Sequence, residues 1–234
     1  MDYFADWSFR VTAGEAFPNE AIQAMELLNE RFGVSRFAVM PEYDARLCSV
    51  PMFLLQSEHS IDRLREALPS HLKIKLLPRV YLSKGLAKTE YLNRLSFGRY
   101  RYLALQLPWG EYEDWIDAEL HELLYGRGYR LLLTSCELYS TFYSNETVER
   151  LFRMPQAVYQ FNYRALTDAD ACRQISKILG REQTVLLGTG LTTLGKARQY
   201  DLFHYQKAAT NHLSVADCQR LLHQSRVFWD FPQR

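Results

Sequence analysis

Polar clusters follow five short apolar runs of this 234-residue chain, and they hold the residues that could do chemistry. The clusters are Pro-Glu-Tyr-Asp, Pro-Arg-Val-Tyr, Pro-Trp-Gly-Glu-Tyr, Thr-Ser-Cys-Glu-Leu-Tyr and Gly-Thr-Gly-Leu-Thr-Thr, within 36–44, 74–81, 102–112, 130–139 and 184–193. Loops at the carboxyl ends of parallel strands converge on one face of a sheet, where sites are built. These strand ends are therefore the candidate site.

The layout of these junctions is typical of a metal hydrolase, but its usual ligands are missing. Hydrolytic metals take imidazole and carboxylate ligands from several strand ends. No histidine falls at a junction. All six lie in predicted helices or connections: His59, His71, His121, His204, His212 and His223.

Helix-like stretches separate the apolar runs and would position their ends. Ile22, Met25 and Leu28 recur at helical spacing and stop at Gly33, which suits a left-handed cap. Similar spacing predicts helices over 60–68 and 145–153 and a weaker one over 86–95, and glycines 126 and 128 end a helix that begins near 111. Capping boxes at 167–170 and 214–217 predict two further helix starts, with Gly180 closing the first of these helices.

The order of elements predicts one α/β domain over 1–234. Seven strand-like segments alternate with helices, with no linker rich in Pro, Gly or Ser and no repeat. Such alternation predicts a parallel sheet covered by helices. We expect a distorted, closed or nearly closed parallel (β/α)7 barrel, with an open doubly wound sheet as the alternative.

Composition excludes several functional classes. The 28 Lys and Arg residues nearly balance the 27 Asp and Glu residues, so no basic excess predicts nucleic acid as a partner. No apolar run reaches membrane-spanning length, and the first residues lack a signal layout. A cytoplasmic protein is the expectation.

The four cysteines are scattered, which suits reduced thiols better than a disulfide framework. Cys136 falls at a strand end, where a nucleophile could lie. No His is near it in the sequence, so we expect a buried free thiol.

The chain resembles the PHP-domain family over nearly its whole length. The best-matched stretch is Trp-Ile-Asp-Ala-Glu-Leu-His-Glu-Leu-Leu-Tyr-Gly-Arg-Gly-Tyr-Arg-Leu-Leu-Leu-Thr-Ser-Cys-Glu-Leu-Tyr, residues 115–139. It is similar to the helix, Lys-Gly-Tyr turn and strand ending in Ala-His-Pro-Glu-Arg-Tyr of one branch. That branch comprises the bacterial manganese-dependent protein-tyrosine phosphatases associated with capsule and exopolysaccharide synthesis. The resemblance implies a PHP-type, TIM-like barrel.

Carried over position by position, the metal-ligand positions of that branch hold no histidine here. They fall on Asp6, Ser8, Glu42, Tyr81, Ser135, Thr189 and Leu191, while the neighbouring Glu is kept as Glu137. Fold and chemistry are separable, and ligand identity is the checkable part of a metal claim. The resemblance therefore predicts the barrel, no retained manganese, and loss of metal-dependent phosphatase activity.

Aromatic and basic residues remain at the same strand ends and could bind a ligand. Tyrosine and tryptophan offer rigid stacking area, and arginine offers forked donors for phosphate or carboxylate. The candidate ligand-binding residues are Trp7, Tyr43, Arg46, Arg79, Tyr81, Trp109 and Tyr139, with Tyr112, Tyr163 and Arg164 nearby in sequence. The alternative is that these rings only pack the barrel ends.

Three functions follow from these observations. The first is an inactive phosphatase relative that acts as a binding or regulatory protein, in capsule or exopolysaccharide control, with a phosphotyrosine protein or a bacterial tyrosine kinase as partner. The second is an active hydrolase with a rebuilt site that uses Asp6, Glu42 and Glu137. The third is a module that binds a phosphorylated or sugar ligand on the aromatic residues.

Overall fold

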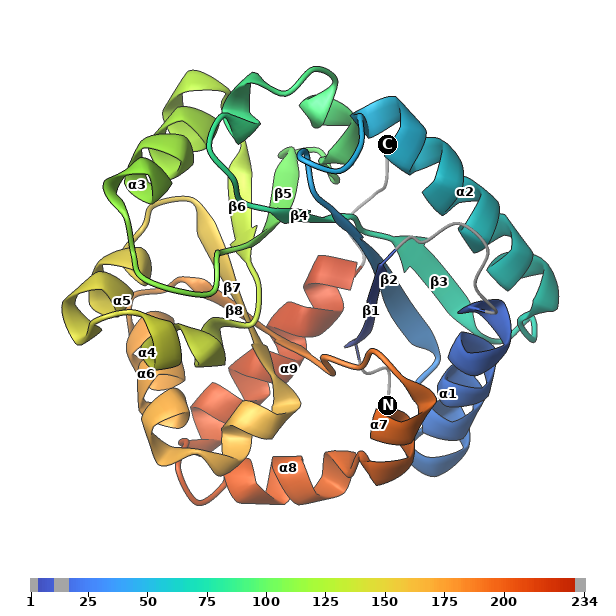
Figure 1. The fold of residues 1–234 in the computed structure, drawn as a ribbon. Coiled ribbons are helices and arrows are strands. Elements are labelled where there is room, and N and C mark those ends of the chain that lie inside the picture. Colours follow the sequence, from blue (N-terminus) through green and yellow to red (C-terminus); the bar gives the residue numbers. More distant parts are fainter. Residues whose placement is uncertain (1–3, 11–16, 230–234) are drawn as a thin grey trace.

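A curled parallel sheet forms the centre of the computed structural model, which describes residues 4–10 and 17–229 (Figure 1). The strand order is β1-β2-β4-β5-β6-β7-β8, so neighbours in the sheet follow one another along the chain. This sequential order confirms the predicted distorted (β/α) barrel, because an open doubly wound sheet would reverse its order. The strands on this path are β1 (Phe4–Arg10), β2 (Arg36–Tyr43), β4 (Arg79–Tyr81), β5 (Tyr102–Gln106), β6 (Arg130–Leu133), β7 (Ala157–Asn162) and β8 (Thr184–Gly188).

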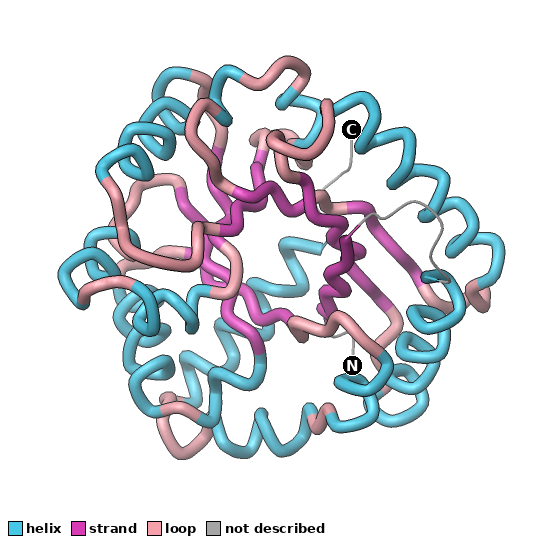
Figure 2. Tube along the Cα trace, viewed as in Figure 1, coloured by secondary structure: helices cyan, strands magenta, loops and turns pink. Residues whose placement is uncertain are grey.

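Helices cover the outside of the strands, which form an inner ring in Figure 2. They are α1 (Phe17–Phe32), α2 (Val50–Ala67), α3 (Asp114–His121), α4 (Tyr139–Phe142), α5 (Asn145–Leu151), α6 (Ala169–Gly180), α7 (Leu194–Gln199), α8 (Leu202–Ala209) and α9 (Val215–Trp229). A single π turn, Glu122–Gly126, extends α3. No helix in the described ranges is long and apolar enough to cross a membrane.

Helix α9 lies where the ring of strands would close, in contact with both β8 and β1. The backbone N–H groups of Val185 and Leu187 in β8 donate to the side-chain oxygens of Gln224 (3.1 Å) and Ser225 (3.2 Å). An unpaired strand edge exposes such donors, and covering it with a helix is one way to protect it. The barrel is therefore distorted at this seam, where side chains take the place of a strand partner.

The third predicted strand consists of two short segments that share one partner. β3 (Lys73–Leu76) pairs with the first half of β2, and β4 pairs with its last residues. Pro78, which has no N–H to donate, lies between them. Because β2 and β4 extend further than predicted, Glu42 and Tyr81 are among the last residues of these strands and do not lie in loops.

Turns and caps agree with most sequence signals. Gly33 has φ +69° and ends α1, and Ser214 Oγ accepts from the N–H of Asp217 at the start of α9. The predicted cap at Thr167 is wrong by one residue, because the carboxylate of Asp168 accepts from the N–H groups that follow. The helix predicted over 86–95 is also wrong, since this stretch forms two separate 3₁₀ turns.

Two apolar cores lie on the two faces of the sheet. The larger one joins the outward strand residues to the helices and includes Phe161 and Leu105. The smaller one fills the barrel interior with Ala38, Met40, Leu77, Phe97, Tyr102, Ala104, Leu132, Val158 and Leu186. Side chains alternate along a strand, so residues two apart share a face. The members of the interior core therefore identify which other strand residues point inward.

Replacing Phe161 with alanine should destabilise the protein by about 3–5 kcal/mol, because its ring is fully buried and packs against Phe152. Urea unfolding followed by circular dichroism measures this change. Phe203→Ala is the matched control, since Phe203 is 57% exposed and its loss should cost far less. Equal losses would contradict the assignment of the outer core.

Candidate functional site

The barrel interior changes from apolar to polar toward the carboxyl ends of its strands. In or directly after each of four strands, a polar residue lies two positions beyond a member of the interior core: Glu42, Gln106, Thr134 and Gln160. Arg79 and Tyr81 join this layer, because they lie in register with Ala104 and Gln106. We call these six residues the barrel mouth.

An ion pair between Arg79 and Glu42 links β4 to β2 within the mouth. The two residues are in register across the strand pair, so their side chains leave the sheet side by side. The Arg79 side chain is 11% exposed and that of Glu42 is 30% exposed. Arg79 Nε is buried and has no hydrogen-bond partner among the described residues. The pair therefore places a fixed cation with an available donor at the carboxyl end of the barrel.

A second arginine extends this charged region to the surface. The Arg46 guanidinium lies 4.9 Å from the Tyr81 ring centroid and donates to both carboxylate oxygens of Asp44, at 2.9 and 2.6 Å. These hydrogen bonds, together with the charge of Asp44, raise the pKa of Arg46. Since Arg46 is largely exposed, a ligand could compete with Asp44 for it at little cost.

Buried polar side chains fill the rest of the mouth. Thr134 Oγ1 donates to the Leu105 carbonyl at 2.9 Å, and the Gln106 amide donates to the Leu107 carbonyl at 3.2 Å. Gln160 donates to the side chain of Asn162 at 3.5 Å. Buried polar groups need such partners, so these contacts hold the interior side chains in fixed positions.

Glu137 is held on the β7 side of the mouth. Its carboxylate accepts from the backbone N–H of Asn162 at 3.1 Å and from the Asn162 side-chain amide. Gly190, with φ +61°, lies directly against that amide, where a Cβ would come within 2.7 Å. Close approach of this loop therefore requires glycine, and Glu137 is committed to a structural contact.

The rim above β5 and β6 is aromatic. Trp109 and Phe142 form an edge-on pair 5.0 Å apart and remain 47% and 39% exposed. Tyr143 packs against Tyr112 at 5.2 Å and donates to the Pro108 carbonyl. Burial, and then the nearby Tyr81, raise the pKa of Tyr143. The tyrosines are thus neutral packing groups, while the Trp109–Phe142 pair offers open aromatic surface.

Several predicted site residues lie elsewhere. Tyr43 points outward, is buried and packs against Phe53, because it lies one residue after the inward Glu42. Tyr139 and Tyr163 are also buried in the outer core, so the expected aromatic face does not include these three rings. Arg164 is exposed after β7.

Three other predicted positions, Ser135, Thr189 and Leu191, are buried in the loops after β6 and β8. Leu191 is part of the outer core, and Thr189 is 9% exposed. Ser135 adopts φ +55°, an uncommon conformation for a residue with a Cβ, immediately before a 3₁₀ turn. Asp6 and Ser8 lie in β1 in register with Ala38 and Met40. The side chains of Asp6, Trp7 and Ser8 are outside the described part of the chain.

The described carboxylates near the mouth are already paired with other groups. Within the described ranges, no three His, Cys, Asp or Glu residues lie close enough together to hold a metal ion. Glu42 is paired with the Arg79 cation, and Glu137 is bound to Asn162. A cation that is already beside a carboxylate opposes the binding of a second cation there. The six histidines lie in helices or in connections, as predicted from the sequence.

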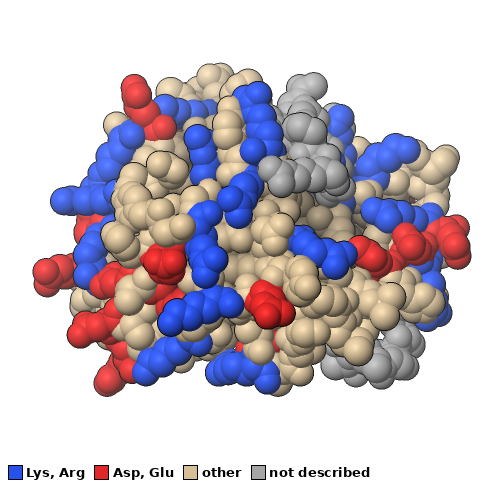
Figure 3. Space-filling view, turned by 90° about the horizontal axis from the view of Figure 1, so that it is seen from above, with Lys and Arg blue, Asp and Glu red and all other residues tan. Residues whose placement is uncertain are grey.

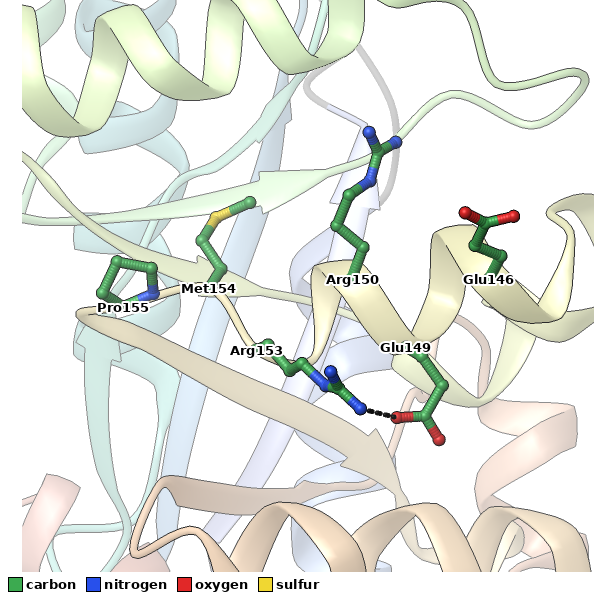
Figure 4. Close-up of a pocket in the computed structure, with 6 residues that line it drawn as sticks. All are labelled: Glu146, Glu149, Arg150, Arg153, Met154 and Pro155. Atoms are coloured by element: carbon green, nitrogen blue, oxygen red, sulfur yellow. Dashed lines mark ion pairs between the residues drawn. The ribbon is translucent and has the colours of Figure 1, made fainter.

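A separate surface cavity of 580 Å³ lies outside the barrel. Figure 4 shows its lining along α5 and the turn that follows: Glu146, Glu149, Arg150, Arg153, Met154 and Pro155. Hydrogen bonds from Lys177 and Arg181 lower the pKa of Glu149, and Arg150 pairs with Asp117 at 2.8 Å. Its charged groups are thus already engaged in contacts between helices.

Comparison by sequence finds no match, but comparison of structures finds a protein with the same fold. No family model matches the chain, and no curated protein matches it by sequence. A solved structure from a crystallographic study of YwqE from Bacillus subtilis and CpsB from Streptococcus pneumoniae superimposes with a TM-score of 0.63 at 13% identity, covering 96% of this chain and 92% of that one. The chain has the fold of these proteins. They are described as unique metal-dependent tyrosine phosphatases.

Sequence reasoning did not find the interior polar layer. Gln106, Thr134 and Gln160 sit inside or directly after apolar runs, where they look like interruptions of a strand. Their spacing could have indicated this layer, because each of the three lies two positions beyond a small or apolar residue that points inward. This spacing is informative only when the inward face of the strand is known.

Cys136 should resist alkylation in the folded protein at pH 8. Its thiol is fully buried, donates to the Leu133 carbonyl at 3.2 Å, and has a pKa raised well above the usual range by burial. Mass spectrometry after iodoacetamide treatment should find the partly exposed Cys48 and Cys218 modified before Cys136. Rapid native labelling of Cys136 would contradict its assignment as a structural thiol.

Gly190→Ala should lower stability by at least ~1–2 kcal/mol, because the added Cβ meets both an unfavourable φ and the Asn162 side chain. Gly180→Ala is the control. That position ends α6, has open space, and should gain about 0.5–1 kcal/mol. Thermal unfolding of the two variants should give melting temperatures that shift in opposite directions, and parallel shifts would argue against the Gly190 contact.

Proposed function

We propose that this chain binds a phosphorylated ligand, such as a phosphotyrosine segment of a protein, at the barrel mouth without metal-dependent hydrolysis. The observation that carries this proposal is the Arg79–Glu42 pair, which places a permanent cation at the carboxyl end of the barrel. Metal-dependent phosphatases would use metal ions to neutralise a phosphate group. Here a guanidinium takes over that electrostatic role but activates no water.

The donors available at the mouth suit a phosphate. Arg79 Nε is buried without a partner among the described residues, so a phosphate oxygen could accept from it while Glu42 stays paired. Arg46 is exposed, pairs with the neighbouring Asp44 and lies over the Tyr81 ring. Arginine forks match phosphate geometry and give short, charge-assisted hydrogen bonds.

The aromatic rim suits the ring of a phosphotyrosine or its flanking residues. Trp109 and Phe142 present exposed rings at the β5 and β6 loops. Exposed aromatic pairs supply rigid apolar contact area at binding sites. The fold is shared with proteins described as tyrosine phosphatases, which supports the same class of ligand. The proposal includes a regulatory role, in which the protein holds this ligand without cleaving it.

Arg46→Ala should weaken binding of a phosphotyrosine peptide by about tenfold, the loss of ~1.4 kcal/mol expected for one charge-assisted contact. Fluorescence anisotropy with the phosphorylated and unphosphorylated forms of one labelled peptide measures this. Arg65→Ala is the matched control, since Arg65 is an exposed arginine paired with a nearby Asp on α2, away from the mouth.

The double variant Arg79→Gln with Glu42→Gln tests the buried pair without leaving one charge unpaired. It should lose phosphate-dependent binding and remain folded by circular dichroism. Equal affinity for the phosphorylated and unphosphorylated peptides in the wild-type protein would refute the proposed ligand class.

A further inference from the structure

A cluster of arginine and tyrosine side chains lies at the opposite end of the barrel from the mouth. Tyr102 and Arg130 lie two positions before interior core residues of β5 and β6, and so point inward at the amino ends of these strands. Phe97 and Tyr102 pair through two backbone hydrogen bonds of 2.9 and 2.8 Å and close a tight loop over 98–101. The amino-end cluster comprises Arg99, Tyr100, Arg101, Tyr102, Tyr129 and Arg130.

Tyrosine rings hold the guanidinium groups of this cluster in place. The Arg130 and Arg99 guanidiniums lie 4.1 and 4.4 Å from the centroid of the Tyr100 ring. Arg101 lies 4.5 Å from the centroid of Tyr129. Cation–π stacking uses the flat face of a guanidinium and leaves its in-plane N–H donors available. The rings therefore present forked donors from three arginines.

These cations have no acidic partner in the described part of the chain. Arg101 donates to the Arg127 carbonyl at 3.2 Å, and Arg130 donates to the Tyr102 hydroxyl at 3.5 Å. Neither they nor Arg99 make an ion pair with a described Asp or Glu, and the nearby Glu122 pairs with Arg127. Figure 3 shows Lys and Arg side chains spread over the face seen there, with Asp and Glu side chains among them. Like charges held together without a counterion favour a bound anion.

We propose that the amino-end cluster is a binding site for a diphosphate group of a small ligand. Arg99 and Arg130, stacked on one ring, would each donate to a phosphate, and Arg101 would add the third positive charge. A diphosphate carries more negative charge than a single phosphate and matches three guanidiniums better. The Tyr100 ring is already occupied by two arginines, so it cannot stack on a nucleotide base. The site would therefore recognise only the phosphates of the ligand. This site is independent of the mouth.

Isothermal titration of the full-length protein with pyrophosphate at constant ionic strength tests the site. The wild-type protein should bind with a saturable heat, and Arg99→Ala should weaken binding by about tenfold or more. Arg99→Lys keeps the charge but loses the fork, and should restore binding only in part. Arg99 is exposed, so these variants should fold normally.

A matched control makes the outcome decisive. Arg94→Ala removes an exposed arginine five positions earlier and should leave pyrophosphate binding unchanged. Absence of saturable binding, or equal weakening by Arg94→Ala and Arg99→Ala, would overturn the proposal in favour of diffuse surface charge. Loss of binding in Arg46→Ala alone would assign pyrophosphate to the mouth. Tighter binding of a single-stranded oligonucleotide than of pyrophosphate would also overturn it.

Discussion

Side chains alternate between the two faces of every strand in this barrel, and that alternation decides which residues reach the mouth. Met40 and Ala104 point inward, so Glu42 and Gln106 do as well, two residues later. Tyr43, one residue further along, points outward against Phe53. Parallel register then places Arg79 directly beside Glu42. The position of the central ion pair thus follows from backbone geometry.

The same geometry explains why the mouth is polar while the barrel below it is not. Small and apolar residues fill the interior layer, and burying each large apolar side chain stabilises the fold by about 1.5–3 kcal/mol. The layer above contains buried amides and a charged pair, which cost free energy unless they are hydrogen-bonded. Such a layer contributes less to stability than an apolar one would. Retaining it is consistent with a role in binding.

The sequence was sufficient to predict the barrel. Alternating strand and helix patterns, a glycine cap at Gly33 and a Ser cap at Ser214 all have local causes. The contacts of the site depend on distant parts of the chain. The Arg79–Glu42 pair needs the register between two strands, and the Glu137–Asn162 contact needs the loops after β6 and β7 to meet. Periodicity within one segment carries no information on either.

The break of the third strand at Pro78 and the extension of β2 to Tyr43 moved the strand ends three or four residues beyond the predicted apolar runs. A shift of one residue exchanges the two faces of a strand, which is why Tyr43 was predicted at the site and Gln106 was not. The seam between β8 and β1 had no signal either, because Gln224 and Ser225 read as ordinary helix residues.

The fold is that of proteins described as metal-dependent tyrosine phosphatases, whereas the mouth carries a guanidinium bound to a carboxylate. Fold alone does not decide between holding and cleaving a phosphate. The most direct measurement is phosphate release from a phosphotyrosine peptide across a titration of Mn²⁺. The account predicts no release that depends on Mn²⁺. Saturable Mn²⁺-dependent release that Asp6→Ala abolishes would contradict it.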